Sequence, residues 1–442
     1  MKKTTRICIL ITLGLMLSNL PSYSQWTSAS MSGGRFNLAA AAGGEYAIFG
    51  GGIGLISIPP AVADLYNINT GAVTQYTTSH GRFNLAAASA GTKLFFAGGS
   101  DDWILSVFDN VEMYDGVTGG WGTMQLSIPR SKLAGAGLGS LVFFGGGVNE
   151  FQGLTYKAVD IYDTITNTWT ASSLTTARFS LTAAAAAGKV LFAGGMNQSN
   201  VFFNTVDIYD VATSTWSADT LSSPRALCAS AASGDKIYIA GGMNPDGTVS
   251  KVVDIYDVTN NTWSTDSLSE ARLALCAAAI GDLVFFAGGA DANGTTVYNT
   301  VDIYNTSTQT WSVANMTDAR TAAAATAVGD LFLVGGGIGT STPVNTIEIY
   351  SIITDIKSYP EKSEKLTLYP NPVNDAMALK FINTLHNGNL EVIDALGRIV
   401  FTMKLNQETS EIKIPTINFD PGVYVVRIDD RKNTMMKKFI KN

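Results

Sequence analysis

Seven arginines recur along the chain at a step of 47 or 48 residues, and their type and spacing could support chemistry. They are Arg35, Arg82, Arg130, Arg178, Arg225, Arg272 and Arg320. Guanidinium groups bind anions through charge-assisted hydrogen bonds, so a ring of equivalent arginines would suit a carboxylate or an acidic sugar. Alternatively, each arginine pairs with an acid of its own repeat. Recurrence in every repeat favours this structural role, because a binding site rarely needs seven identical copies. In addition, a buried charge normally requires a partner.

Few other residues could carry catalysis. The chain has two histidines, His80 and His386, whereas a catalytic metal site needs several converging ligands. A serine-histidine-aspartate triad would have to use His80, and no sharp strand-to-helix turn presents a nucleophile beside it. Cys228 and Cys276 are interpreted as buried apolar side chains rather than as a disulfide. The sequence therefore predicts no metal and no cofactor, and it favours a non-catalytic protein over an enzyme.

The arginines belong to a long internal repeat that must position them. Sixteen residues after each arginine a glycine pair begins, and an acid with a tyrosine two residues later follows. Nine residues after the first six acids stand Val73, Trp121, Trp169, Trp216, Trp263 and Trp311. Only the stretch from glycine pair to acid changes in length, between 12 and 14 residues. Length variation belongs in surface loops, so this stretch is the adjustable element.

Each repeat divides into four short strands. The first is rich in small residues, as at 180–187, and a turn such as Gly234-Asp235 leads to an apolar second strand. Four strands per unit of this length are typical of a propeller blade. In the seventh repeat the stretch from arginine to tyrosine, which ends at Tyr350, is not followed by a tryptophan. Trp26, at the N-terminal end, conversely has no such stretch before it. The sequence thus predicts an all-β fold, a seven-bladed β-propeller closed by the N-terminal strand.

The pattern of arginine, glycine pair, acid-x-tyrosine and tryptophan resembles the kelch family. Asn167-Thr168-Trp169 after Tyr162-Asp163 is close to that family's signature between its third and fourth strands. The resemblance covers about residues 25–354 and implies a β-propeller. It also implies a rival function, because some kelch propellers isomerise acidic sugars with arginines and a glutamate at the channel mouth.

The loops after the glycine pairs differ between repeats, as binding loops do. Trp103, Phe151 and Phe202 stand in them, and such rings could stack on sugars or anchor a protein partner. Alternatively, these rings cover neighbouring blades. Glu150 and Asp101-Asp102 are the loop acids placed to assist an enzyme.

The N-terminal residues 1–24 are interpreted as a secretory signal peptide, with a basic start, a short apolar run and small residues before position 25. Its removal would change the net charge from −7 to −10. That acidity argues against a nucleic acid partner. No further long apolar segment follows, so we expect no membrane span in the mature chain.

Beyond a charged linker at 355–365, residues 366–442 form a pattern typical of a small β-sandwich. This segment resembles the C-terminal sorting domain of the type IX secretion system of Bacteroidetes. The matching residues are Pro370, Asn371, Pro372, Gly397, Pro421, Gly422, Tyr424, Lys437 and Lys438. The resemblance implies that the type IX secretion machinery recognises residues 366–442. It implies export through the periplasm to the outer cell surface or the medium.

Together these features predict a secreted or cell-surface, non-catalytic interaction module for a protein or glycan ligand. The alternative is a sugar-active enzyme of the kelch type that uses channel-mouth arginines. A third possibility is a chiefly structural surface protein.

Overall fold

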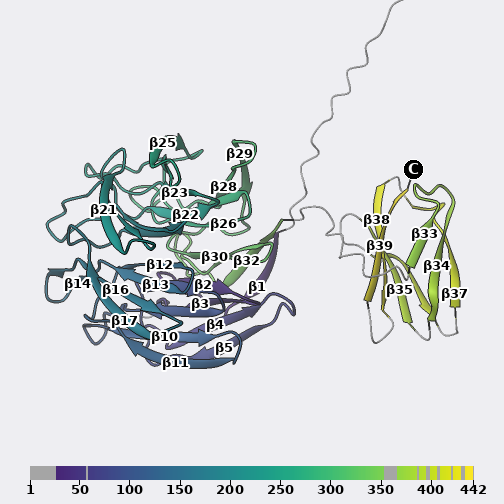
Figure 1. Ribbon diagram of the computed structural model, residues 1–442, viewed down its shortest axis with the longest axis horizontal. Coiled ribbons are helices and arrows are strands. Elements are labelled where there is room, and N and C mark those ends of the chain that lie inside the picture. The colour runs from purple at the N-terminus through teal and green to yellow at the C-terminus, as the bar shows by residue number, and fades with distance from the viewer. Residues whose placement is uncertain are drawn as a thin grey trace, which may run out of the picture. The chain divides into compact units, whose positions relative to one another are not determined.

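The structure is a computed structural model that describes residues 26–55, 58–352, 366–385, 388–394, 399–405, 409–419, 422–429 and 434–441. The chain divides into two compact units, Met1–Ile353 and Thr354–Asn442 (Figure 1). Every regular element in the described residues is a β-strand. The expected signal peptide at 1–24 and linker at 355–365 lie outside the described residues.

Seven four-stranded antiparallel sheets make up the described part of the first unit, apart from two short hairpins. The first strands of these sheets are β2 (Ala39–Gly43), β6 (Ala86–Ala90), β12 (Ala134–Leu138), β18 (Thr182–Ala186), β22 (Ala229–Ser233), β26 (Cys276–Ile280) and β30 (Ala324–Val328). The second strands are β3 (Tyr46–Gly50), β7 (Lys93–Ala97), β13 (Leu141–Gly145), β19 (Lys189–Ala193), β23 (Lys236–Ala240), β27 (Leu283–Ala287) and β31 (Leu331–Gly335).

The third and fourth strands complete each sheet outward from these pairs. The third strands are β4 (Val62–Asn67), β10 (Asn110–Asp115), β16 (Ala158–Asp163), β20 (Thr205–Asp210), β24 (Val252–Asp257), β28 (Thr300–Asn305) and β32 (Thr346–Ser351). The fourth strands are β5 (Val73–Thr77), β11 (Gly120–Gln125), β17 (Thr168–Ser173), β21 (Thr215–Thr220), β25 (Thr262–Ser267), β29 (Thr310–Asn315) and β1 (Trp26–Ser30).

The sheet of the last repeat takes its fourth strand from the other end of the chain. β1 pairs antiparallel with β32, and Trp26 lies opposite Tyr350. The two rings are 5.1 Å apart in an edge-to-face arrangement, as aromatic pairs prefer. Strands more than 300 residues apart in the sequence therefore form one sheet.

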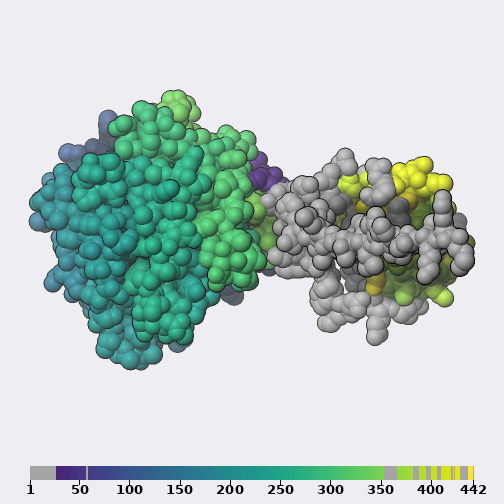
Figure 2. Space-filling model, turned by 90° about the horizontal axis from the view of Figure 1, so that it is seen from above, coloured from purple at the N-terminus to yellow at the C-terminus, as the bar shows by residue number. Residues whose placement is uncertain are grey.

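The small residues of the first strands have a steric cause. Each first strand contacts the first strands of the sheets before and after it, and β2 contacts β30. At Gly137 in β12, a methyl group would come within 1.8 Å of the carbonyl oxygen of Ser89. Packing between sheets thus overrides the helix propensity of these alanine-rich runs. The second strands are buried on both faces, because neighbouring sheets pack against each other. Figure 2 shows the outer surface of this unit from above.

The glycine pairs join neighbouring sheets through the backbone. Gly146 has a φ of +68°, and a methyl group there would lie 2.5 Å from the carbonyl oxygen of Arg178 in the next repeat. Gly147 donates its N–H to the same carbonyl oxygen at 2.9 Å. The equivalent hydrogen bond occurs after all seven pairs at 2.8–3.0 Å, including Gly337 to Arg35. Glycine is required here for both its conformation and its lack of a side chain.

The second unit contains two sheets that share one hydrophobic core. The strands of one sheet are β33 (Leu366–Tyr369), β34 (Ala376–Leu385) and β37 (Thr409–Pro415). Those of the other are β35 (Gly388–Asp394), β36 (Ile399–Leu405), β38 (Gly422–Asp429) and β39 (Thr434–Lys441). Tyr424 is buried in that core against Phe419 and Phe439.

Candidate ligand-binding face

All seven repeat arginines are buried, with at most 2% of each residue exposed. Each lies beside the acid of its own repeat. The pairs are Arg35–Asp64 (2.6 Å), Arg82–Glu112 (3.8 Å), Arg130–Asp160 (2.8 Å), Arg178–Asp207 (2.7 Å), Arg225–Asp254, Arg272–Asp302 and Arg320–Glu348 (2.7 Å). The ion-pair interpretation therefore fits the geometry of every repeat.

The third repeat shows how one guanidinium is held. Arg130 donates to the carbonyl oxygens of Gly146, Ile128 and Phe144 at 2.8–3.0 Å and to Asp160 at 2.8 Å. The second carboxylate oxygen of Asp160 accepts the Ser127 N–H at 3.2 Å. Burial lowers the pKa of Arg130, and the charge of Asp160 opposes that shift. The arginine thus links the second and third strands of its own sheet through hydrogen bonds.

The second repeat departs from this geometry. Glu112 stands 3.8 Å from Arg82 and instead accepts hydrogen bonds from the Ser79 N–H and hydroxyl, both at 2.6 Å. Burial lowers the pKa of Arg82 to about 10, and Glu112 only partly opposes it. This repeat has the loosest of the seven ion pairs.

These positions correct the expectation that the arginines Arg35, Arg82, Arg130, Arg178, Arg225, Arg272 and Arg320 circle the channel mouth. None of them lines the cavity at the centre of the first unit. Their guanidinium groups are turned into the sheets, because each finds its acid and its carbonyl oxygens there. An anionic ligand in that cavity would not reach them.

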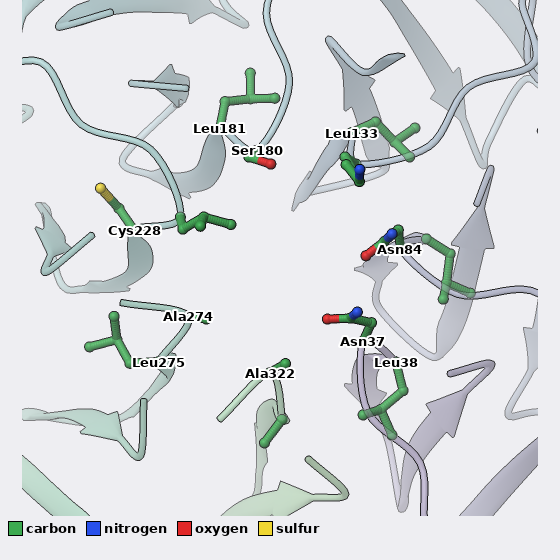
Figure 3. A pocket seen from close by; sticks show the side chains of 14 residues that line it. Asn37, Leu38, Asn84, Leu133, Ser180, Leu181, Cys228, Ala274, Leu275 and Ala322 are labelled. Carbon is green, nitrogen blue, oxygen red and sulfur yellow. The ribbon is translucent and has the colours of Figure 1, made fainter. Parts of the chain in front are cut away.

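The cavity is lined instead by the residues two and three positions after each arginine, and its volume is about 220 Å³ (Figure 3). The residues at the second position are Asn37, Asn84, Lys132, Ser180, Leu227, Ala274 and Ala322. Each donates its N–H to the carbonyl oxygen of its counterpart in the preceding repeat at 2.8–3.2 Å, and Asn37 donates to Ala322. Their φ angles lie between +49° and +58°. These seven residues, which we call the mouth of the cavity, therefore form a ring of hydrogen-bonded peptide groups, and each residue adopts a strained backbone conformation.

Sequence reasoning missed these seven residues. Their fixed offset of two from each arginine was visible, yet their types have nothing in common. No side-chain pattern announces a positive φ at Leu227 or Ala274, where glycine or asparagine would be expected.

The loops after the glycine pairs flank this mouth. Isolated β-bridges join the residue after each arginine to the residue after each glycine pair, as Phe179 to Met196. Two loops form short hairpins, β8 (Ser100–Asp101) with β9 (Ser106–Val107) and β14 (Val148–Asn149) with β15 (Leu154–Thr155). The loops are therefore anchored at their bases.

The predicted aromatic residues differ in exposure. Trp103 is 67% exposed, Phe151 is 36% exposed and Phe202 is half-buried. Trp103 begins an apolar tip with Ile104 (55%) and Leu105 (66%), and Leu105 has a φ of +51°. Of the predicted aromatic residues, Trp103 is thus the one presented fully to solvent.

Acidic groups stand next to this tip. The buried Asp101 accepts the Trp103 N–H at 2.8 Å, which fixes the turn. Burial and the charge of Glu150 raise the pKa of Asp102, while Lys132 opposes the shift. Glu150 also accepts the Ser131 hydroxyl at 2.7 Å. Asp102, next to the tip, therefore interacts electrostatically with Lys132, which lines the cavity.

The remaining chemical candidates are isolated. Nδ1 of His80 lies 3.0 Å from the Ser79 hydroxyl, and its ring packs on Phe108 at 4.9 Å. Cys228 and Cys276 are free thiols. No cluster of three or more metal-ligating side chains occurs in the part of the chain that the structure describes.

The sorting residues are described only in part. Asn371 accepts the Ile440 N–H at 2.9 Å, so this motif contacts the last strand. Lys437 and Lys438 lie on β39, and Gly422 begins β38. Gly397 and Pro421, together with His386, lie outside the described residues.

Comparison with known proteins now identifies both units. The KLHDC2/KLHL20/DRC7 Kelch-repeats domain matches residues 87–272 and 180–366, and a secretion system C-terminal sorting domain matches residues 367–442. The chain belongs to the kelch-repeat family, and its first unit is a β-propeller. The sorting domain directs it through type IX secretion to the cell surface or the medium.

Among solved structures, a protein described as "Structure of YjhT" is similar, with 17% identity and a TM-score of 0.51. The match covers 62% of this chain and 95% of the other, and at this identity it supports the fold alone. No curated protein matches the chain. The described residues include no helix with the length and apolar character needed to cross a membrane.

Proposed function

We propose that the first unit is a seven-bladed propeller closed by its N-terminal strand, spanning residues 25–354. Three cyclic features support the proposal: the contacts between first strands, the hydrogen bonds of the glycine pairs, and those around the mouth. In each, the seventh repeat connects back to the first. In such a ring β1 covers the edge of β32, and only the short outer edges of the blades remain exposed.

We further propose that this propeller is a secreted or cell-surface, non-catalytic binding module for a protein or glycan ligand. The observation that carries the proposal is the tip at 103–105, where three large apolar side chains in sequence are more than half exposed. Exposed apolar clusters on a rigid hairpin are typical of interaction sites, and tryptophan is enriched among the residues that dominate binding energy. Phe151, which is 36% exposed, stands at the tip of the corresponding hairpin in the next repeat.

The sugar-active alternative loses its main support, because the arginines that it needs are buried and paired. The charged groups near the mouth are then Lys132, Asp102 and Glu150. Lys132 belongs to the ring around the cavity, whereas Asp102 and Glu150 stand on loops that vary between repeats. Variable loops on a constant framework favour recognition over a shared catalytic apparatus.

The test compares position 103 with position 117, since Val117 is 79% exposed in a turn between a third and a fourth strand. A photo-crosslinking residue at 103 should capture a protein on the surface of the producing cells, and the same residue at 117 should not. If the ligand is a glycan, a glycan array should instead give a signal that Trp103→Ala abolishes and Val117→Ala retains. A chain with neither outcome is not a binding module that uses this surface.

A further inference from the structure

The seven residues at the mouth divide into two chemical halves. Asn37, Asn84, Lys132 and Ser180 come from four consecutive repeats and carry hydrogen-bonding groups. Leu227, Ala274 and Ala322 come from the next three and carry only carbon. A sevenfold backbone ring thus presents a polar half and an apolar half to one cavity.

Figure 3 shows how the side chains are turned. The polar ends of Asn37, Asn84 and Ser180 point toward the centre of the cavity. The leucines one position further on, such as Leu181 and Leu275, point away into the sheets. The polar side chains at the ring positions therefore point further into the cavity than the leucines that follow them, although both line it.

Lys132 supplies the one formal charge among the residues that line this cavity. Its ammonium group lies 5.8 Å from the centre of the Phe179 ring, a cation–π distance. Within the described residues it has no ion pair within 4.0 Å. Asp102 is near enough to Lys132 to interact with it electrostatically, and Glu150, which also interacts with Asp102, accepts a hydrogen bond from Ser131. The ammonium group therefore has no close ion pair among the described residues and can donate hydrogen bonds to an anion in the cavity.

We propose that the mouth binds a small aliphatic carboxylate. Its carboxylate group contacts Lys132 and the side-chain donors of Asn84 and Ser180, and its hydrocarbon part covers Leu227 and Ala274. A single lysine matches a single negative charge, and a charge-assisted hydrogen bond is the strongest contact that this wall offers. The opposite wall has no side-chain partner for hydroxyl groups, so polyhydroxylated anions would leave polar groups unsatisfied there. The cavity offers about 220 Å³, which is enough for a small molecule.

The site differs from the surface around Trp103, so the two proposals fail separately. Calorimetric titration of residues 25–442 with isocaproate should give saturable binding. Isocaproamide, which lacks the charge, and gluconate, which lacks the apolar part, should bind at least about tenfold more weakly. Isocaproate binding should remain in Trp103→Ala.

Two variants test the two halves. Lys132→Met keeps the aliphatic stem and should weaken isocaproate binding at least about tenfold. The exposed Lys157 provides the matched control, and Lys157→Met should bind as the parent protein does. Leu227→Asn should weaken binding while keeping the fold, because asparagine tolerates a positive φ. The proposal is overturned if isocaproate does not bind, if gluconate binds as well, or if Lys132→Met has no effect in a protein with unchanged near-ultraviolet circular dichroism.

Discussion

The substitution Asp160→Asn tests whether the arginine–acid pairs hold the propeller together. The two carboxylate oxygens of Asp160 accept from different donors, Arg130 at 2.8 Å and the Ser127 N–H at 3.2 Å. An amide offers one acceptor oxygen, and its NH₂ group would then face a donor. The variant therefore loses the counter-charge of a fully buried guanidinium and one hydrogen bond.

The expected cost is large. Removing one partner of a buried ion pair destabilises a protein by about 3–5 kcal/mol, because the remaining charge stays desolvated. Arg130 has no exposed surface, so solvent cannot compensate for the loss. A domain is typically stable by about 5–15 kcal/mol, so the variant should lose a major part of its stability.

The second repeat provides a matched control. Glu112 lies 3.8 Å from Arg82, and one of its oxygens accepts both hydrogen bonds from Ser79. Glu112→Gln can keep that oxygen, so we expect a cost of only about 1–3 kcal/mol. Urea unfolding followed by tryptophan fluorescence measures both variants. Equal destabilisation, or a neutral Asp160→Asn, would refute the reasoning that charge compensation at close range is the stabilising feature.

Three further predictions concern the backbone, the tyrosines and the thiols. Gly146→Ala should destabilise by more than about 2 kcal/mol, whereas Gly139→Ala, with a similar φ but open space, should cost about 1 kcal/mol in the same urea assay. Burial raises the pKa of Tyr114 from 10.0 to about 12, so the unfolded chain loses this proton first. The free energy of unfolding should then fall as the pH rises from 10 to 12, and Tyr114→Phe should reduce that fall. Burial raises the pKa of Cys228 to about 11 and of Cys276 to about 12, and of the two residues only Cys276 is buried as a whole. An aromatic disulfide reagent at neutral pH should therefore label Cys276 only after unfolding. Rapid labelling of Cys276 in the native protein would contradict its burial.

The sequence was sufficient for the repeat and for its local partners. The constant spacing from each arginine to its glycine pair marked an invariant framework, in which the arginine lies four residues before the first strand and the glycine pair directly follows the second. The acid two residues before each tyrosine supplied the partner charge. The same spacing left Trp26 without the first three strands of a repeat and Tyr350 without a fourth strand. These two residues lie opposite each other in the structure. Export was also visible in the sequence, because the sorting domain carries its own motifs at 366–442.

The candidate sites were predicted less completely. An arginine has the same identity whether its guanidinium faces a channel or a buried aspartate, so only coordinates distinguished the two. Likewise, the sequence could not say that Trp103 is exposed while Phe202 is half-buried, since both are aromatic residues in the loop after a glycine pair.

The sequence by itself determined the periodic framework, because each strand needs its own apolar pattern and each turn its own glycine. Tertiary structure alone decided what the mouth presents. Residues from repeats as far apart as Asn37 and Ala322 become neighbours there through hydrogen bonds between peptide groups, which every residue possesses and no side chain reveals. Their side chains were free to differ, and the contrast between Lys132 and Leu227 arises only once the repeats surround one cavity.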